Sequence, residues 1–116
     1  MKKDDLVFIK HILDYIKSIE ESTNTITRED FDSNNDLRDA TIRRIEIIGE
    51  ASKNISKELK DSHPEVKWKE IIGTRDRIIH KYFEVEWDIV WNIATIDISE
   101  LKKQINAIKE EIEKKS

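Results

Sequence analysis

The strongest constraint on the fold is an apolar pattern in the last third of the chain. Between residues 87 and 112, apolar side chains recur at alternating steps of four and three: Trp87, Trp91, Ala94, Ile98, Leu101, Ile105, Ile108 and Ile112. This spacing places them on one stripe of an α-helix. A seam of this kind favours left-handed packing against neighbouring helices. The pattern therefore predicts a long helix that belongs to a helical bundle.

Two earlier segments carry apolar residues at helical spacing. The first predicted helix has a stripe made of Leu6, Ile9, Ile12, Leu13, Ile16 and Ile19. The second spans about residues 36–59, and one face carries Leu37, Thr41, Arg44, Ile48, Ala51, Ile55 and Leu59. The polar residues 21–36 predict a loop with a short helical turn, because Thr27 and Asp30 have the spacing of a capping pair.

A third helix is predicted between the second and the last. Pro64 can occupy its first turn, where a missing N–H costs nothing, and the helix should fray near Phe83. With 2 glycines and 1 proline in 116 residues, the chain has too little turn chemistry for a sheet of many short strands. The prediction is one all-α domain over residues 1–116, folded as an up-down four-helix bundle.

The two glycines lie inside helical patterns. Each of Gly49 and Gly73 costs a helix about 1 kcal/mol relative to alanine. A missing side chain is most useful where another backbone comes close. We therefore expect the second and third helices to make a tight contact, with each other or with a second subunit.

Composition limits the possible functions. The chain has no cysteine, and no apolar run approaches the roughly 20 residues that span a bilayer. His11 and His63 are isolated, so no metal site is expected. The formal charge of −4 makes broad electrostatic capture of RNA unfavourable, so any RNA contact must come from a local cluster. Because the chain starts directly in an amphipathic pattern, we expect a cytoplasmic protein.

The segment "GTRDRIIHKYF", residues 73–83, concentrates chemically versatile side chains within three turns: Arg75, Asp76, Arg77, His80, Lys81 and Tyr82. On one straight helix Asp76 and His80 share a face, whereas Arg75 lies about 140° around the axis from His80. Either the helix distorts here or a second copy completes the site. A dimer with a two-fold axis beside the third helix would bring two copies together.

These residue types suit RNA cleavage without a metal. Histidine titrates near neutral pH, so His80 can exchange a proton with the ribose 2′-OH. Arginine stays charged and its fork matches two phosphate oxygens, which suits Arg75 to the developing charge. Asp76 can orient His80, and Tyr82 can stack on a base. The competing interpretation is a solvated helix face that carries cations.

The motifs resemble a known family. "RDRIIHKYF" is similar to the Arg-x4-His-x-Tyr signature of HepT-type toxins of the HEPN superfamily, and "IIGEA" and "HPEVKW" resemble its second and third helices. The resemblance covers most of the chain from about Leu37 onward. It implies a HEPN-like helical bundle that dimerises beside the third helix and acts as a metal-independent endoribonuclease without a cofactor.

The resemblance also implies roles for individual residues. Arg75 and His80 correspond to the catalytic pair, and Asp76 stands where the family commonly has Asn or Asp, which indicates a supporting role. Beside these, the neighbouring Arg77 is a further supporting candidate, and Lys81, at a position that is often small or variable in the family, is a candidate phosphate contact. Tyr82 corresponds to the tyrosine that a minimal nucleotidyltransferase antitoxin (MntA-like) modifies with AMP. The chain would then be the toxin of a type VII-like toxin–antitoxin pair, whose RNA substrate is a tRNA or an mRNA.

Two alternatives remain open at this point. The domain can be a catalytically inactive HEPN partner that binds nucleotides or a nucleotidyltransferase, or a purely structural dimer module. The aromatic residues Trp68, Trp87 and Trp91 are better explained as core or interface residues than as a base-stacking platform.

Overall fold

The computed structural model describes residues 4–79 and 84–115. Its helices are α1 (Asp5–Thr23), α2 (Arg28–Asp32), α3 (Asn35–Asn54), α4 (Lys57–Ser62), α5 (Trp68–Ile72), α6 (Thr74–Ile78), α7 (Trp87–Asn92), the π-helical segment η2 (Ile93–Asp97) and α8 (Ile98–Lys114). Within the described part of the chain, extended pairing is confined to an isolated antiparallel bridge between Ile79 and Val85. The prediction of an all-α fold is confirmed.

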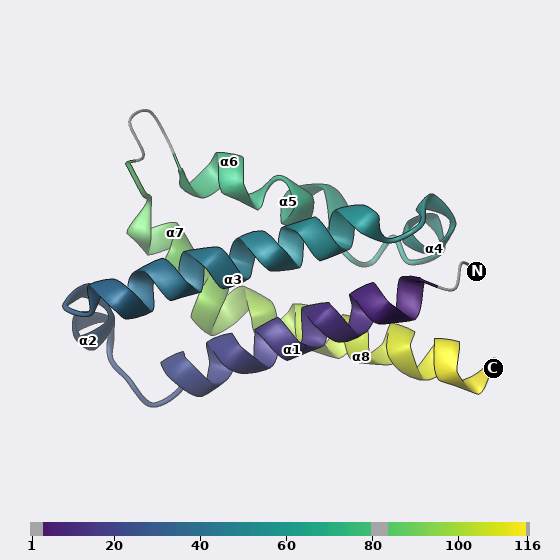
Figure 1. The fold of residues 1–116 in the computed structure, drawn as a ribbon, viewed down its shortest axis with the longest axis horizontal. Helices are drawn as coiled ribbons and strands as arrows, with labels where there is room; N and C mark the ends of the chain where they lie inside the picture. The colour runs from purple at the N-terminus through teal and green to yellow at the C-terminus, as the bar shows by residue number, and fades with distance from the viewer. Residues whose placement is uncertain (1–3, 80–83, 116) are drawn as a thin grey trace.

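The helices run back and forth along the long axis of the molecule (Figure 1). α1 packs against α3 and α8, and α3 packs on its other side against α5 and α6. The start of α1 and the end of α8 lie at the same end of the molecule (Figure 1). α3 therefore lies between the first helix and the segment that carries the candidate site.

The core is built from the apolar stripes that the sequence indicates. Four isoleucines of α1 are fully buried, Ile9, Ile12, Ile16 and Ile19, and they face a buried row on α8 made of Ile98, Leu101, Ile105, Ile108 and Ile112. The predicted spacing is thus confirmed for these residues, whereas Leu6 and Leu13 of the first predicted stripe are only partly buried. Phe31, on the short helix α2, is also fully buried and closes one end of the core.

The loop before α3 folds as predicted. Thr27 accepts a hydrogen bond from the Asp30 amide, and the Asp30 carboxylate accepts one from the Thr27 amide, each at 3.1 Å. This reciprocal capping box satisfies two amides that a helix start leaves unpaired. It starts a five-residue helix in an otherwise polar stretch.

The second predicted helix is shorter than expected. The sequence pattern extends to Leu59, but α3 ends at Asn54 and α4 begins at Lys57. The buried carboxylate of Asp5 accepts hydrogen bonds from the Ser56 amide at 2.8 Å and the Ser56 hydroxyl at 2.7 Å. The Ser56 hydroxyl in turn caps Leu59. Ser56 therefore starts a new helix instead of continuing the old one.

The third predicted helix was wrong in both its start and its continuity. Pro64 lies in a turn closed by the Val66 amide and the His63 carbonyl, and α5 begins only at Trp68. α5 ends at Ile72, Gly73 caps it, and α6 extends from Thr74 to Ile78. Gly73 is therefore at a helix boundary, contrary to the expectation that it lies within a helix.

The last predicted helix is continuous but not uniform. A π-helical turn, Ile93–Asp97, separates α7 from α8. Because a π-helical turn contains more residues than an α-helical turn, the residues before it that face the core are not the ones predicted for a regular α-helix. Val90, Ile93 and Ala94 are buried, while Trp87 and Trp91 are half-buried. Of the three tryptophans, Trp68 is the core residue, and its indole N–H donates to the His63 carbonyl at 3.0 Å.

Gly49 permits a close contact between α3 and α5. A Cβ atom at this position would lie 3.1 Å from the carbonyl oxygen of Ile71 and 3.9 Å from the Cα of Ile72. The expectation that a backbone approaches Gly49 is confirmed, and the approaching backbone belongs to the same chain. This contact sets the distance between α3 and the α5–α6 segment.

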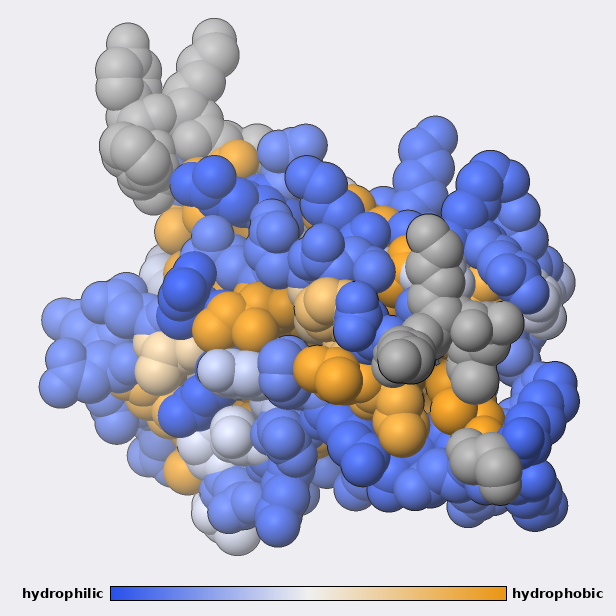
Figure 2. All heavy atoms as spheres, turned by 45° about the vertical axis from the view of Figure 1, so that its right-hand side comes forward, coloured by the Kyte–Doolittle hydropathy of each residue, from blue (hydrophilic) through white to orange (hydrophobic). Residues whose placement is uncertain are grey.

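The surface is mostly charged. On the face shown in Figure 2, hydrophilic side chains surround a band of apolar ones. None of the helices in the described residues combines the length and hydropathy needed to cross a bilayer. Nor do His, Asp and Glu side chains in those residues form a group suited to a metal ion.

Substituting Gly49 tests the contact between α3 and α5. Gly49→Val adds a branched side chain where even one carbon would touch the Ile71 carbonyl. Overpacking of this kind costs about 1–3 kcal/mol. We expect urea denaturation to give a free energy of unfolding lower by that amount. Asp39→Val, at an exposed position of the same helix, controls for the helix propensity of valine. Equal stability of the two variants would contradict the contact.

Candidate functional site

Arg75 lies at the edge of a groove between α3 and the α5–α6 segment. The groove has a volume of about 310 Å³ and is lined by Arg43, Ile45, Glu46, Gly49, Glu50, Ile71, Ile72, Thr74 and Arg75. The Arg75 Nε atom lies 3.3 Å from Oε2 of Glu46, which forms an ion pair between α6 and α3. The Arg75 side chain is 61% exposed, so it can meet a ligand from solvent.

The local fold of α6 explains why Arg75 faces outward. Thr74 and Ile78 are one turn apart, and both are buried. The Thr74 hydroxyl donates to the carbonyl oxygens of Glu70 and Ile71 at 2.9 and 2.8 Å, which ties α6 to the end of α5. The three residues between them, 75–77, are therefore exposed.

Arg77 lines a different groove from Arg75. The Arg77 groove lies between the α5–α6 segment and η2–α8, and its charged residues are Lys67, Arg77, Glu65, Glu70, Asp97 and Glu100. The Arg77 groove thus has two cationic side chains and four carboxylates. The Arg75 groove has two cationic side chains, Arg43 and Arg75, and two carboxylates, Glu46 and Glu50. The Arg77 groove is the less favourable of the two for a phosphate.

The helical geometry expected for Asp76 does not extend as far as His80. α6 ends at Ile78, and Ile79 is extended, with φ −116° and ψ 120°. The expectation that Asp76 and His80 share one face of a continuous helix was therefore wrong in its premise. The distortion anticipated at this segment is confirmed. His80, Lys81 and Tyr82 lie outside the described residues.

The backbone on both sides of residues 80–83 is anchored. Ile79 and Val85 form the antiparallel bridge, and the Glu86 amide donates to the Ile78 carbonyl at 2.8 Å. The described residues on either side of residues 80–83 are thus paired with each other directly after α6.

The start of α7 is held by contacts with α2 and α3. Arg28 forms an ion pair with Asp88 at 2.8 Å, and together with Asp32 this carboxylate raises the pKa of the Arg28 guanidinium. The guanidinium of Arg38 lies 4.3 Å from the ring centroid of Trp87, a cation–π distance. Phe31 packs edge-on against Trp87 with ring centroids 6.0 Å apart. These contacts fix the far side of the bridge.

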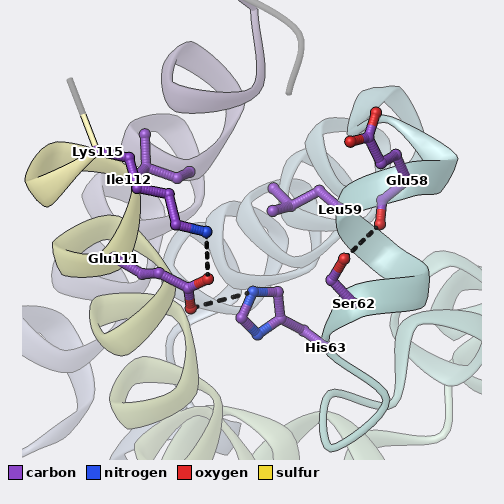
Figure 3. A pocket seen from close by; sticks show the side chains of 7 residues that line it. All are labelled: Glu58, Leu59, Ser62, His63, Glu111, Ile112 and Lys115. Carbon is purple, nitrogen blue, oxygen red and sulfur yellow. Dashed lines mark hydrogen bonds and ion pairs between the residues drawn. The ribbon is translucent and has the colours of Figure 1, made fainter.

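A second pocket contains His63 and shares no lining residue with the Arg75 groove (Figure 3). His63 Nδ1 lies 3.1 Å from Glu65, and Nε2 lies 3.5 Å from Glu111 of α8. A backbone hydrogen bond, and after it the hydrogen bond with His63, lowers the pKa of the Glu65 carboxyl. His63 thus links the turn after α4 to α8, a structural role.

Sequence reasoning missed Glu46 and Arg43 as neighbours of the candidate site. Arg44, which the sequence places on the apolar face of the second helix, donates to the Ser22 hydroxyl at 3.0 Å. Gly49 was the available signal: residues one turn before it on α3 face the approaching α5–α6 segment.

Comparison with known proteins identifies the family. A model of the family described as "Ribonuclease HepT-like" matches residues 12–108. The chain belongs to the HepT-like ribonuclease family.

Three relatives illustrate the match. The chain is 44% identical over 114 residues to a Methanocaldococcus jannaschii protein named "Gamma-glutamylcyclotransferase and putative RNase". The matched region is 98% of this chain but 51% of that protein. A second protein of that organism, a "Putative RNase", is 38% identical over 114 residues, with coverage of 98% and 94%. A "Probable ribonuclease HepT" of Thermococcus cleftensis is 39% identical over 109 residues, with coverage of 94% and 99%. The chain thus spans about half the length of the first relative and nearly all of the other two. No solved structure gave a significant match.

The anchoring of α6 is testable through its buried residue Ile78. Ile78→Ala removes a fully buried side chain between the exposed arginines and the bridge, and such truncations cost about 2–5 kcal/mol. We expect a loss of unfolding free energy in that range by urea denaturation. Ile96→Ala, at a position that is 63% exposed, should change it by less than about 0.5 kcal/mol. Similar losses in both variants would show that α6 is not anchored through Ile78.

Proposed function

We propose that this protein is a metal-independent endoribonuclease with Arg75 and His80 as its catalytic pair. Membership of the HepT-like ribonuclease family supports the reaction class. The observation that supports the site most directly is the exposed guanidinium of Arg75, which an ion pair to α3 holds at a groove. His80 follows five residues later in the sequence.

The reaction needs one base, one cation and one acid. A base removes the proton of the ribose 2′-OH, the 2′-oxygen attacks phosphorus, and the bond to the 5′-oxygen breaks. The leaving 5′-oxygen takes up a proton from the acid, so the products are a 2′,3′-cyclic phosphate and a 5′-hydroxyl. His80 serves in proton transfer, and Arg75 binds the phosphate oxygens as their charge grows.

The other predicted site residues have smaller roles in this proposal. Asp76 orients His80, and Lys81 contacts a neighbouring phosphate. Arg77 supports binding from the adjacent groove, where four carboxylates oppose it, so its contribution is smaller than that of Arg75. No cofactor takes part.

We further propose that the domain is a four-helix HEPN bundle that forms a homodimer beside the α5–α6 segment. The antiparallel course of α1, α3, α5–α6 and α7–α8 supports the bundle (Figure 1). A two-fold axis beside this segment would place two Arg75 grooves next to each other, so that one RNA strand can contact both.

The biological role that fits this activity is that of a toxin acting on tRNA or mRNA in the cytoplasm. In a type VII-like pair, a minimal nucleotidyltransferase antitoxin would transfer AMP to Tyr82. Each AMP adds bulk and a negative phosphate near Arg75, where substrate phosphate binds. The modification would therefore block RNA binding.

Substitution of the catalytic pair tests the nuclease assignment. Arg75→Ala removes the charge that stabilises the transition state, so we expect the cleavage rate of total cellular RNA to fall about 10²–10³-fold. His80→Ala should lower it about 10²–10⁴-fold through loss of proton transfer.

The matched control is Arg77→Ala, which removes the same side chain two residues away and should lower the rate by less than about tenfold. Circular dichroism confirms that each variant is folded. If the wild-type protein leaves all RNA intact yet binds a nucleotidyltransferase, the inactive binding partner is the better description.

Modification of Tyr82 is tested by co-expression with a nucleotidyltransferase encoded beside this gene. Intact-mass spectrometry should show additions of AMP mass, and peptide mapping should place them on Tyr82. Tyr82→Phe removes the acceptor oxygen and should abolish the additions, while Tyr15→Phe should leave them unchanged. Neutralisation of the Tyr82→Phe protein by the partner would indicate simple masking instead.

A further inference from the structure

We propose that Glu46 is a positioning residue, which holds the guanidinium of Arg75 at the α3 groove before RNA binds. The inference rests on the proposed ribonuclease function and adds to it a residue from a different helix. The observation that carries it is the ion pair between Arg75 Nε and Glu46 Oε2, at 3.3 Å.

The two ends of this ion pair differ in rigidity. Glu46 lies in the middle of the 20-residue helix α3, between the buried residues Ile45 and Ile48, and its side chain is 25% exposed. Arg75 lies on the five-residue helix α6, and its side chain is 61% exposed. Glu46 is therefore the fixed partner, and Arg75 is the group that gains a preferred orientation.

The geometry of the guanidinium explains how one carboxylate can position it without blocking it. Arginine has five N–H donors in a planar fork. Glu46 contacts the Nε side of this fork, and it is the charged partner that the described residues provide for Arg75. The edge formed by the two terminal nitrogens is a separate pair of donors that matches two phosphate oxygens.

Pre-positioning matters here because the groove does not attract RNA by net charge. Its two arginines, Arg43 and Arg75, are balanced by Glu46 and Glu50, and the whole chain has a formal charge of −4. An exposed arginine loses rotamer freedom when it binds a phosphate. An arginine that is already restrained loses less, so the ion pair favours a productive contact with the scissile phosphate.

The same groove provides a matched control. Glu50 lies four residues after Glu46 on α3, lines the groove and is exposed. Glu50→Ala removes one negative charge from the groove, as Glu46→Ala does, but leaves the ion pair with Arg75 in place. A difference between the two variants reports positioning rather than charge.

The first measurement is kinetic, with the RNA that the wild-type protein cuts fastest as substrate. Glu46→Ala should lower kcat about fivefold with a smaller change in KM, because a misplaced Arg75 stabilises the transition state less. Glu46→Gln keeps an oxygen that accepts from Nε and should lose less than Glu46→Ala. Glu50→Ala leaves the ion pair in place but removes a negative charge from the groove, so its effect should appear mainly in KM rather than in kcat. Urea denaturation confirms that all three variants remain folded.

The second measurement does not depend on activity. ¹⁵N relaxation of the Arg75 Nε–H bond should show greater disorder in Glu46→Ala than in the wild type, with Glu46→Gln between them and Glu50→Ala unchanged.

The outcomes separate this inference from the proposed function. A wild-type protein that cuts no RNA overturns both. An active wild type with an equally active or faster Glu46→Ala variant overturns the positioning role alone. Equal losses in Glu46→Ala and Glu50→Ala, or an Nε–H bond whose order does not depend on Glu46, overturn it as well.

Discussion

The close approach of α5 to α3 at Gly49 is the contact on which the rest of the candidate site depends. Without a Cβ atom at this position, the carbonyl oxygen of Ile71 comes within 3.1 Å of where that atom would lie. α6 follows directly after Gly73, and the Thr74 hydroxyl ties it to the last carbonyls of α5. The position of Arg75 relative to α3 therefore depends on the backbone contact between α5 and Gly49. The helix propensity lost at Gly49, about 1 kcal/mol, is the cost of that geometry.

This arrangement directs Arg75 and Arg77 into different grooves. Because Thr74 and Ile78 face the core, Arg75 and Arg77 emerge on either side of α6 and line different grooves. The balance of charge differs between these grooves, with carboxylates in excess around Arg77. Two arginines that are nearly adjacent in sequence therefore meet different electrostatic surroundings. In the proposed function, a chain with net negative charge would therefore select a phosphate by the placement of one cation rather than by a basic surface.

The sequence predicted the parts of the fold that depend on periodic burial. The stripes on α1 and α8 and the capping box of α2 were all readable because each depends on residues close in sequence. The helix breaks at Ser56 and Gly73 could not be predicted in this way. The first depends on Asp5, which lies 51 residues away from Ser56. The second directly follows Ile71 and Ile72, whose backbone contacts α3 at Gly49. The ion pair of Arg75 with Glu46 escaped for the same reason, since its partners lie on helices that meet only in the folded chain.

The end of α6 at Ile78 affects whether a second subunit is needed to complete the proposed site. On a continuous helix, Arg75 and His80 would point about 140° apart and lie about 7.5 Å apart along the axis, so a single chain could not direct both at one phosphate. The chain leaves helical geometry at Ile79, which removes this angular restriction. Convergence of the two side chains then requires no second subunit. The proposed dimer must therefore be justified by what it adds, namely a second Arg75 groove along the same RNA strand, rather than by a need to complete the first.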